Sequence, residues 1–583
     1  MFPYTWIEGR SWEPIRGLQL HDLGLDQAFL NLSSRLSKNT WVYFQRQPCF
    51  KCTQYSLLSE VAAHNSSTVK ISSVYDLDML VLNENAGTTF DLVDYHAKVL
   101  ECSHQTSFGE FGIYDLIISA NGNKTECRIE TVQPSVDIVL PVFAVAMMSI
   151  IFLALTSGCY YLWKCWNRSH KADARNSDTE SKGEYSTVNK GGSQVKKLTN
   201  RLKSLDAFRG VCVVLLLFSN GFMGGYQNIG HAVWEGMPIA ELPFPWFLWI
   251  TAVCIPLKFK NVLENGEPRG EILLEIFKRF IFLFVLGLMV NSVIQGVQLE
   301  TIRYYGVLQR IAFMYLFAGG IFVLSWPKTY KEYSGSHSDI RVLLPQWVIH
   351  GVIHLLYLCL VFFLPIPGCP TGYVGPGGIS EGGKYFNCTG GTFGYVDKLL
   401  HDERHLFDAP TTKDVYKVKV FDPEGPFSNL PSLLTMILGV QAGTILVMHH
   451  GWSARKNRLL SWGFICIFLG LVLHFSNAIP INKQLWNTSY SFVTAGVAFI
   501  CFTLFIYLID KIQLWNGFPL VSLGLNCLAL YIGSKVASNI LPWHFAFGKM
   551  DTHFIRLIDS CWSVFIWALI AIFLHKKKII ISA

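Results

Sequence analysis

Long apolar runs constrain this sequence more than any other feature. A membrane-spanning helix needs about 20 mostly apolar residues, and the sequence contains eleven candidate runs, of which the one at 243–257 is short and interrupted by prolines. Only 15% of its 583 residues are charged, against about 25% in soluble domains. The pattern predicts a polytopic α-helical membrane protein with about 11 transmembrane helices. The runs cover residues 138–162, 208–226, 243–257, 277–298, 305–326, 344–364, 430–448, 459–478, 490–510, 518–540 and 557–575.

Lysine and arginine are concentrated in one set of loops, which predicts that this set faces the cytosol. The opposite short loops contain only Arg303, Lys483, Lys549 and Arg556. The C-terminus, with Lys576–Lys578, therefore lies in the cytosol in this prediction, and residues 1–136 lie on the other side. The net charge of +7 is explained by membrane orientation and requires no nucleic-acid partner.

Cysteines and glycosylation sequons point to the same orientation. The exoplasmic segments contain an even set of candidates for disulfides, Cys49, Cys52, Cys102, Cys127, Cys369 and Cys388. Asn-x-Ser/Thr sequons on that side begin at Asn31, Asn65, Asn123, Asn387 and Asn487. The CFKC segment at 49–52 is read as a tight disulfide loop, with a metal or redox site as the alternative.

The chain divides into four regions by composition. Residues 1–136 alternate β-branched and aromatic stretches with Asn, Gly and Ser turns, which predicts a luminal β-rich, β-sandwich-like domain. Residues 137–163 form the first transmembrane helix, and 164–203 a disordered cytosolic linker. Residues 204–583 form a ten-helix domain with a long luminal loop at 365–429. The sequence begins without a signal-peptide pattern, so the first span translocates the domain or the start is an alternative or truncated one.

One histidine lies just beyond a membrane-length run, in NGFMGGYQNIGHAVWEG (Asn220–Gly236). Asn220 ends the run, and three glycines then allow a sharp turn and a close approach to a ligand. His231 titrates near neutrality and is suited to proton transfer. The alternative is an interfacial histidine beside a tryptophan belt that includes Trp234.

Other polar groups at the edges of apolar runs are weaker candidates. Gln309 and Arg310 begin an apolar run, where an arginine needs an anion or a carbonyl group as partner. Asp422 and Glu424 precede the run at 430–448. Asn526 lies inside the run at 518–540, where the common role is hydrogen bonding between helices.

Taken together and in order, the motifs resemble one family. They are RLKSLDAFRG, HAVWEG before PFPWFLW, GVLQRIA, GCPTGYVGPGG with FNCTGG, FDPEG with LGVQAG, PINKQLWNTSY and LGLN. This series is similar to the heparan-α-glucosaminide N-acetyltransferase family and covers about residues 200–575. The resemblance implies transfer of acetyl from cytosolic acetyl-CoA to the terminal non-reducing α-glucosamine of heparan sulfate, in the lysosomal membrane. It also implies a homodimer.

The resemblance assigns roles to individual residues. It implies that His231 and Asn220 are catalytic, with His231 as general base in direct transfer or as carrier of an acetyl group. No metal ligand set is evident. Positive groups expected near the acetyl-CoA phosphates are Arg201, Lys203, Arg209, Lys258, Arg279 and Arg310. Side chains expected on the path of the sugar are Trp234, Gln309, Asp422, Glu424 and Asn526.

Other functions fit parts of the sequence. Polar residues within spans also suit a solute transporter, although the sequence has no internal repeat. A receptor or scaffold with an inert bundle is a third reading. Ser534 stands where a histidine is expected in the family, which leaves room for an acetyltransferase that acts on another amino sugar.

Overall fold

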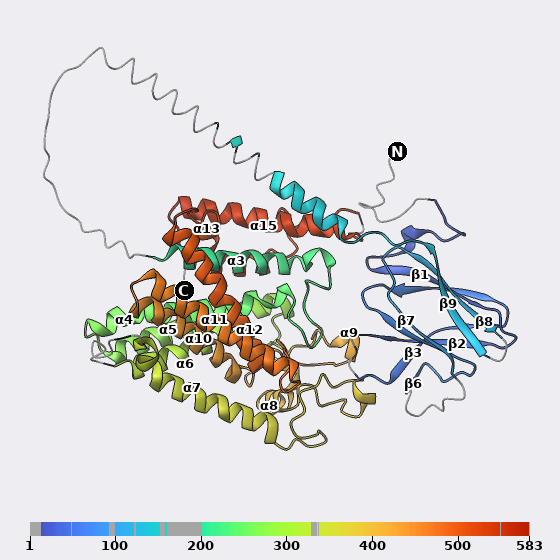
Figure 1. The fold of residues 1–583 in the computed structure, drawn as a ribbon, viewed down its shortest axis with the longest axis horizontal. Helices are drawn as coiled ribbons and strands as arrows, with labels where there is room; N and C mark the ends of the chain where they lie inside the picture. Colours follow the sequence, from blue (N-terminus) through green and yellow to red (C-terminus); the bar gives the residue numbers. More distant parts are fainter. Residues whose placement is uncertain are drawn as a thin grey trace, which may run out of the picture.

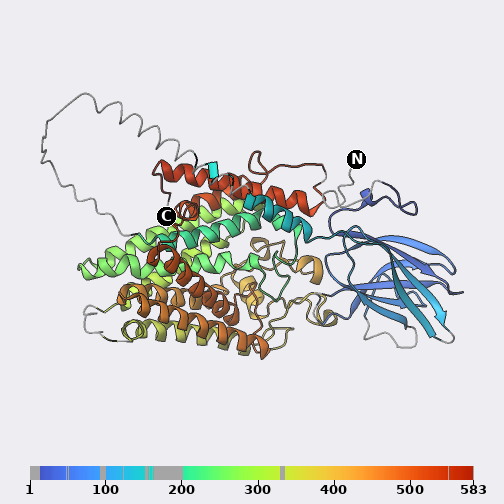
Figure 2. The same cartoon turned by 45° about the horizontal axis from the view of Figure 1, so that its top comes forward.

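The computed structural model shows a β-sandwich at one end of a bundle of long helices (Figure 1). A long loop with the short helices α8 and α9 lies between the two parts. Figure 2 shows the same arrangement from a second direction. The structure describes residues 13–47, 49, 51–91, 100–121, 124–151, 155, 158–159, 162, 201–327, 335, 337–548 and 550–581.

Two sheets pack face to face in the N-terminal domain. One has the strand order β4-β1-β8-β9 and the other β6-β3-β2-β5-β7. Alternate residues of β1, Ala28, Leu30 and Leu32, are buried against residues of the second sheet such as Val42 and Val81. The strands are β1 (Gln27–Ser34), β2 (Thr40–Arg46), β3 (Gln54–Val61), β4 (Ser66–Ser72), β5 (Leu77–Leu82), β6 (Thr89–Asp91), β7 (Leu100–Thr106), β8 (Ile113–Asn121) and β9 (Lys124–Gln133).

Seven helices of the described chain are long and apolar enough to cross a membrane: Ile239–Glu264, Val307–Ser325, Ser338–Phe363, Asn429–Met448, Trp452–Phe475, Thr488–Lys511 and His553–Lys576. The total of about 11 spans stays a prediction. The main helices are α3 (Lys203–Asn220), α4 (Pro243–Glu264), α5 (Arg269–Gln295), α6 (Val307–Ser325), α7 (Ser338–Phe363), α10 (Asn429–Met448), α11 (Trp452–Phe475), α12 (Thr488–Phe505) and α15 (His553–Lys576).

The run at 518–540 is not one continuous helix. It folds as α13 (Leu520–Leu525) and α14 (Cys527–Val536), separated at Asn526. Asn526 has a non-helical backbone conformation, with φ −115° and ψ 28°. Its side chain donates to the carbonyl of Ile579 and accepts from the N–H of Ile581, so it holds the C-terminal segment against the break.

Two glycines allow α10 to pack closely on α4. A Cβ atom at Gly439 would lie 2.5 Å from the carbonyl oxygen of Trp249, and one at Gly443 would lie 2.5 Å from that of Val253. Small residues four apart bring helix backbones together in this way within membranes. α10 is almost completely buried and forms the centre of the bundle.

The loop at 365–429 is folded, as expected from its aromatic and cysteine content. It contains α8 (Thr392–Leu400) and α9 (Lys413–Tyr416) and is closed by the Cys369–Cys388 disulfide. Phe393, Tyr416 and Phe421 from the loop form an apolar cluster with Tyr357 of α7 and with Trp234.

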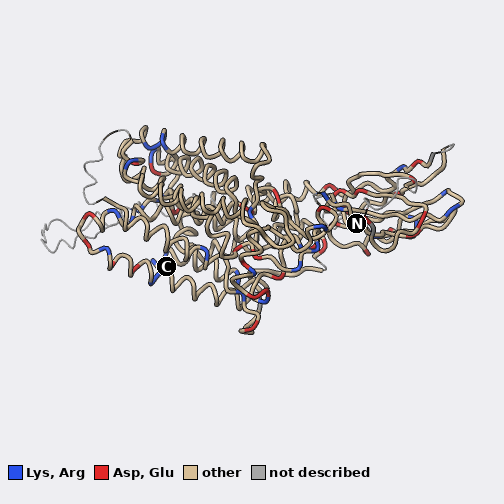
Figure 3. Tube along the Cα trace, turned by 90° about the horizontal axis from the view of Figure 1, so that it is seen from below, with Lys and Arg blue, Asp and Glu red and all other residues tan. Residues whose placement is uncertain are grey.

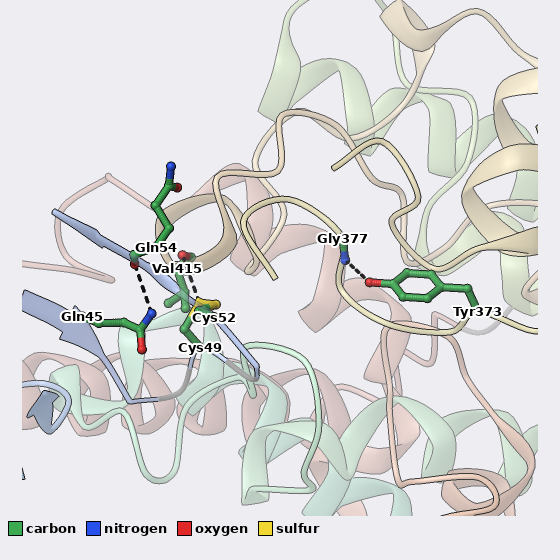
Figure 4. The surroundings of a disulfide bond; sticks show 7 residues. All are labelled: Gln45, Cys49, Cys52, Gln54, Tyr373, Gly377 and Val415. Carbon is green, nitrogen blue, oxygen red and sulfur yellow. Dashed lines mark hydrogen bonds between the residues drawn. A yellow bond between two sulfur atoms is a disulfide. The ribbon is translucent and has the colours of Figure 1, made fainter. Parts of the chain in front are cut away.

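All six candidate cysteines are paired. Cys49 pairs with Cys52, and Cys102 with Cys127, in addition to the loop disulfide. The Cys49–Cys52 turn contacts the loop at Val415 (Figure 4). Nearby, Lys51 forms an ion pair with Glu381 of the same loop at 3.6 Å. The β-sandwich therefore packs against the loop and is not simply tethered to the bundle.

Charged residues lie mostly towards the ends of the helices, and their middle parts carry few (Figure 3). We call the end beside the β-sandwich the sandwich end, and the end with Arg201, Lys258 and Lys576 the far end. Asp206 at the start of α3 is 4% exposed and accepts hydrogen bonds from Arg201 and Arg209 at the far end.

Candidate functional site

A glycine loop, Gly221–Gly225, follows α3 and brings the chain to His231. Gly224 and Gly225 have φ values of +70° and +85°, which L side chains rarely adopt. A Cβ atom at Gly221 would lie 2.8 Å from the hydroxyl of Ser560 on α15. The loop can therefore turn tightly against α15 because Gly221, Gly224 and Gly225 lack a Cβ atom.

His231 lies at the sandwich end with its side chain 45% exposed. Its Nδ1 atom is 3.2 Å from an oxygen of Glu241, a residue that is completely buried. The same oxygen accepts the backbone N–H of Ala232 at 3.1 Å. The second oxygen of Glu241 pairs with the ammonium group of Lys483 at 2.7 Å. A carboxylate at this place can accept the Nδ1 proton and leave Nε2 as the basic atom.

Asn220 is fixed by two side chains of α14. Its amide nitrogen donates to the Ser534 hydroxyl at 3.1 Å, and its oxygen accepts from the Lys535 ammonium at 2.8 Å. Lys535 also interacts electrostatically with Glu424 and with Lys483. Asn220 and His231 thus each lie among polar groups at the sandwich end, and the lysines beside them interact electrostatically.

Arg303 holds the two carboxylates of the FDPEG segment together. It forms ion pairs with Asp422 and, at 2.5 Å, with Glu424. Burial raises the pKa of Asp422, although Arg303 faces both of its oxygens. Burial also tends to raise the pKa of Glu424. The positive charges of Arg303, Arg310 and Lys483 outweigh this effect, so the pKa of Glu424 is lowered.

Three other predicted residues lie buried near this network. Arg310 is 1% exposed, donates to the Pro423 carbonyl at 2.7 Å and to the Ser428 hydroxyl, and lies over the Trp486 ring. Trp234 is 3% exposed and packs on Phe421. Gln309 packs against Gly287, and its amide has no hydrogen-bond partner among the described residues.

The other positive groups predicted near the acetyl-CoA phosphates lie elsewhere. Arg201, Lys203 and Arg209 begin α3 at the far end. Lys258 of α4 pairs with Glu275 of α5 at 2.6 Å. The guanidinium of Arg279 lies 4.3 Å from the centre of the Tyr315 ring. Arg310 does not lie with this group, because α6 begins at the sandwich end and its first turn holds Arg310 against the FDPEG segment.

A cavity of about 280 Å³ opens within the loop. Asp422 and Phe421 line it, as do Asp397 and the disulfide Cys369–Cys388. Asp397 is 2% exposed and accepts the backbone N–H of Phe427 at 3.0 Å. Burial raises the pKa of Asp397 to about 8. The cavity therefore adjoins the carboxylate that Arg303 holds.

The predicted glycosylation residues differ in exposure. Asn65 and Asn387 are exposed, and Asn31 is half-buried in β1. Asn487 is 5% exposed and caps α12 by accepting the N–H of Tyr490 at 3.0 Å, while its amide donates to Pro480. In the structure Asn487 is therefore a helix cap, with its amide nitrogen bonded to a backbone carbonyl. Asn123 lies outside the described residues.

The sequence drew attention to His231 and Asn220 but not to their partners. Glu241 carries no signal of its own in the sequence, and Lys483 and Arg303 stood out only as basic residues in the opposite short loops. The structure also brings together Asp26, Glu110 and His553, whose candidate ligand atoms all lie within 4.8 Å of one another. No local pattern predicts that set, because Asp26 and His553 are 527 residues apart.

Comparison with known proteins gives two relatives of the same name. The chain is 31% identical to the heparan-alpha-glucosaminide N-acetyltransferase of Mus musculus over 588 residues, which are 96% of this chain and 89% of the mouse protein. It is also 31% identical to the Homo sapiens protein of the same name over 593 residues, with 96% and 88% covered. No family model matches the chain.

Proposed function

This chain belongs to the heparan-alpha-glucosaminide N-acetyltransferase family and is an acyltransferase, and on that premise we propose which reaction it performs. It transfers acetyl from cytosolic acetyl-CoA to the terminal non-reducing α-glucosamine of heparan sulfate in the lysosome lumen. One observation carries the proposal: the exposed imidazole of His231 has its Nδ1 atom on the buried carboxylate of Glu241.

The His231–Glu241 pair suits a general base. Glu241 accepts the Nδ1 proton, so the Nε2 atom takes a proton from the amino group of the sugar as that nitrogen attacks. The new N–C bond forms at the acetyl carbonyl, and the C–S bond of the thioester breaks. The CoA thiolate leaves and takes up the proton from His231.

Asn220 supports the developing charge. Its amide is held by Ser534 and Lys535, so its orientation is set before the substrate binds. An amide N–H or the Lys535 ammonium can donate to the carbonyl oxygen as it becomes negative. Removal of one such donor lowers the rate by about 10²–10³-fold in other acyl transfers.

The two substrates approach from opposite ends of the bundle in this proposal. The exposed positive side chains at the far end, Arg201 and Lys203 among them, attract the phosphates of acetyl-CoA. The sugar amine approaches Asp422 and Glu424, which lie at the sandwich end beside the loop cavity. The sandwich end is luminal, and the family resemblance supports a homodimer as the assembled form.

The assay is acetyl transfer from labelled acetyl-CoA to a glucosaminide in membranes that contain the full chain. We expect His231→Ala to abolish transfer and Asn220→Ala to lower it by about 10²-fold or more. His64→Ala, at an exposed turn of the sandwich, is the matched control and keeps full activity. Transfer that survives His231→Ala would contradict the assignment of the base.

A wild-type chain that is folded and yet inactive towards glucosamine would favour another amino sugar or a transporter. A second assay addresses the covalent alternative. Incubation with labelled acetyl-CoA and no sugar leaves the protein unlabelled if transfer is direct. Label that His231→Ala removes would establish an acetyl-histidine step instead.

A further inference from the structure

Three distant segments meet at His553, the first residue of α15. Its Nε2 atom is 3.1 Å from Asp26 and 3.4 Å from Glu110, both of which belong to the β-sandwich. Its Nδ1 atom is 2.8 Å from the carbonyl oxygen of Gly224 in the glycine loop. The imidazole is 4% exposed, so these contacts are made away from bulk water.

Both ring nitrogens therefore face acceptors. A backbone carbonyl can only accept, so Nδ1 must carry a proton. Two carboxylates face Nε2, and a neutral imidazole would direct a lone pair at them. The contacts are satisfied when Nε2 also carries a proton, that is, when His553 is an imidazolium.

His553 also connects the glycine loop to neighbouring side chains and to α15. The ring of Tyr226 stacks on the His553 ring at 4.4 Å between centroids, and the Tyr226 hydroxyl donates to the carbonyl of Ile138 at 2.7 Å. About two turns further along α15, Ser560 donates to the carbonyl of Gly221. The glycine loop follows Asn220 and leads through residues 226–230 to His231, so its position against α15 influences where both side chains lie.

We propose that His553 is a positioning residue, whose protonated ring ties the β-sandwich to the glycine loop and makes the assembly of the active site depend on acidic pH. Its effect on catalysis rests on the function proposed above. Its effect on the conformation of the loop does not. The proposal makes the β-sandwich a part of the catalytic unit.

The charges around His553 set the sign of the pH dependence. From the sandwich it faces Asp26 and Glu110, and from the loop it faces the phenol of Tyr226. On its own helix, Arg556 donates to the carbonyl of Met550, and Asp559 accepts from His544. Burial, together with nearby negative charge, raises the pKa of Tyr226 to about 12, so it stays a neutral phenol. The contacts of Nε2 with Asp26 and Glu110 hold while His553 is protonated and are lost as the pH rises, so the tie between the sandwich and the loop is lost with them.

Hydrogen–deuterium exchange of the full chain in detergent tests the contact without any reference to activity. The reporters are the amides of Tyr226 and Gly230, which donate within the loop segment. At pH 5 we expect His553→Gln to exchange about tenfold faster than the wild type there, because a charge-assisted hydrogen bond is lost. At pH 8 the two chains are expected to exchange alike. His64→Gln serves as the matched control.

A second variant separates charge from packing. In the double variant Asp26→Asn, Glu110→Gln, an amide can donate to a neutral Nε2 atom, so the contact no longer needs the second proton. For the loop amides, we expect the ratio of the exchange rate in this double variant to that in His64→Gln to be nearly the same at pH 5 and pH 8. A wild-type loop whose protection relative to His553→Gln is the same at pH 5 and pH 8 would overturn the proposal.

A divalent cation held among Asp26, Glu110 and His553 is the competing explanation, and the experiment distinguishes it. If the loop amides became protected from exchange at pH 8 on addition of zinc, and lost that protection with a chelator, a metal ion rather than a proton would hold the contact. That result would overturn the proposal. In the transfer assay we expect His553→Gln to lower kcat mainly at acidic pH and to leave KM for acetyl-CoA unchanged. An inactive wild type with the expected exchange pattern would refute the proposed function alone.

Discussion

At the scale of single residues, the candidate site depends on side chains that orient other side chains through hydrogen bonds and ion pairs. Glu241 is the clearest case, because it is buried between an imidazole, a backbone N–H and an ammonium group. A buried carboxylate with three donors is costly to neutralise or remove. The orientation of His231 therefore depends on a residue that need not touch either substrate.

We expect Glu241→Gln to lower kcat by about 10²–10⁴-fold, because an amide can present a donor to Nδ1 and stabilise the wrong tautomer. KM for the sugar should change little. Steady-state kinetics of Glu241→Gln, with His64→Gln as the control, measures the changes in kcat and KM separately. A variant with normal kcat and a raised KM would show that Glu241 binds substrate and does not orient the imidazole.

Asp397 gives a prediction about pH and stability. Its pKa rises from an ordinary 3.8 to about 8 because the carboxyl group is buried. The folded chain therefore holds this proton more tightly than the unfolded chain, and the contribution of Asp397 to stability falls as the pH rises from about 4 to about 8.

Asp397→Asn removes that dependence while it keeps the acceptor for the Phe427 N–H. We expect the variant to have a higher Tm than the wild type at pH 8 and a similar Tm at pH 4.5. Each kcal/mol is worth about 2–4 °C in a large domain. Melting curves at the two pH values check this, and an equal difference at both would contradict the assignment.

The sequence predicted residues better than relationships between residues. His231 and Asn220 stood out because polar groups at the edge of an apolar run need a reason. Lys535 and Ser534, which fix Asn220, lie more than 300 residues away, and although Ser534 stood out where a histidine is expected, no local pattern linked it to Asn220. Arg310 was placed with the wrong set, because charge alone does not say at which end of a helix an arginine lies.

At the scale of elements, apolar length predicted where most long helices form, because length and hydropathy decide whether a segment can be helical in lipid. α10 coincides with its predicted run, whereas α5 and α7 begin eight and six residues before theirs. The interruption at Asn526 was not predicted. It depends on the backbone of Ile579 and Ile581, which takes up the polar groups that the break exposes.

The contact of α10 with α4 can be tested by one substitution. Gly439→Val places a branched side chain where a single Cβ atom would already lie 2.5 Å from the Trp249 carbonyl. We expect a loss of about 1–3 kcal/mol or more in stability, because the backbones must separate. Gly451→Ala has open space and is the matched control. Thermal melting in detergent measures both, and equal Tm values would contradict the close packing.

At the scale of the whole molecule, the sandwich and the loop 365–429 form one continuous structure at one end of the bundle. Their contacts include the Lys51–Glu381 ion pair and the packing of Cys49 on the loop. Both parts must therefore lie on the same side of the membrane. This follows from packing alone and agrees with the orientation inferred from charge.

Glycan mapping tests that arrangement. We expect Asn65→Gln and Asn387→Gln each to remove one glycan and to increase gel mobility by one step, because both residues are exposed at the sandwich end. Asn487→Gln should leave mobility unchanged, since Asn487 is buried as a helix cap. A glycan at only one of the two exposed residues would place the sandwich and the loop on different sides.

The contact between Asp26 and His553 also has a consequence for biosynthesis. The ribosome makes the sandwich first and reaches His553 only 527 residues later, about half a minute to two minutes at roughly 5–20 residues per second. During that interval Asp26 and Glu110 are without the imidazole that joins them. The β-sandwich can therefore make its contacts with His553 only after α15 has been synthesised. A nascent chain that stops before His553 would leave Asp26 and Glu110 without this partner, and the quality-control machinery of the cell could recognise such a chain as incompletely folded.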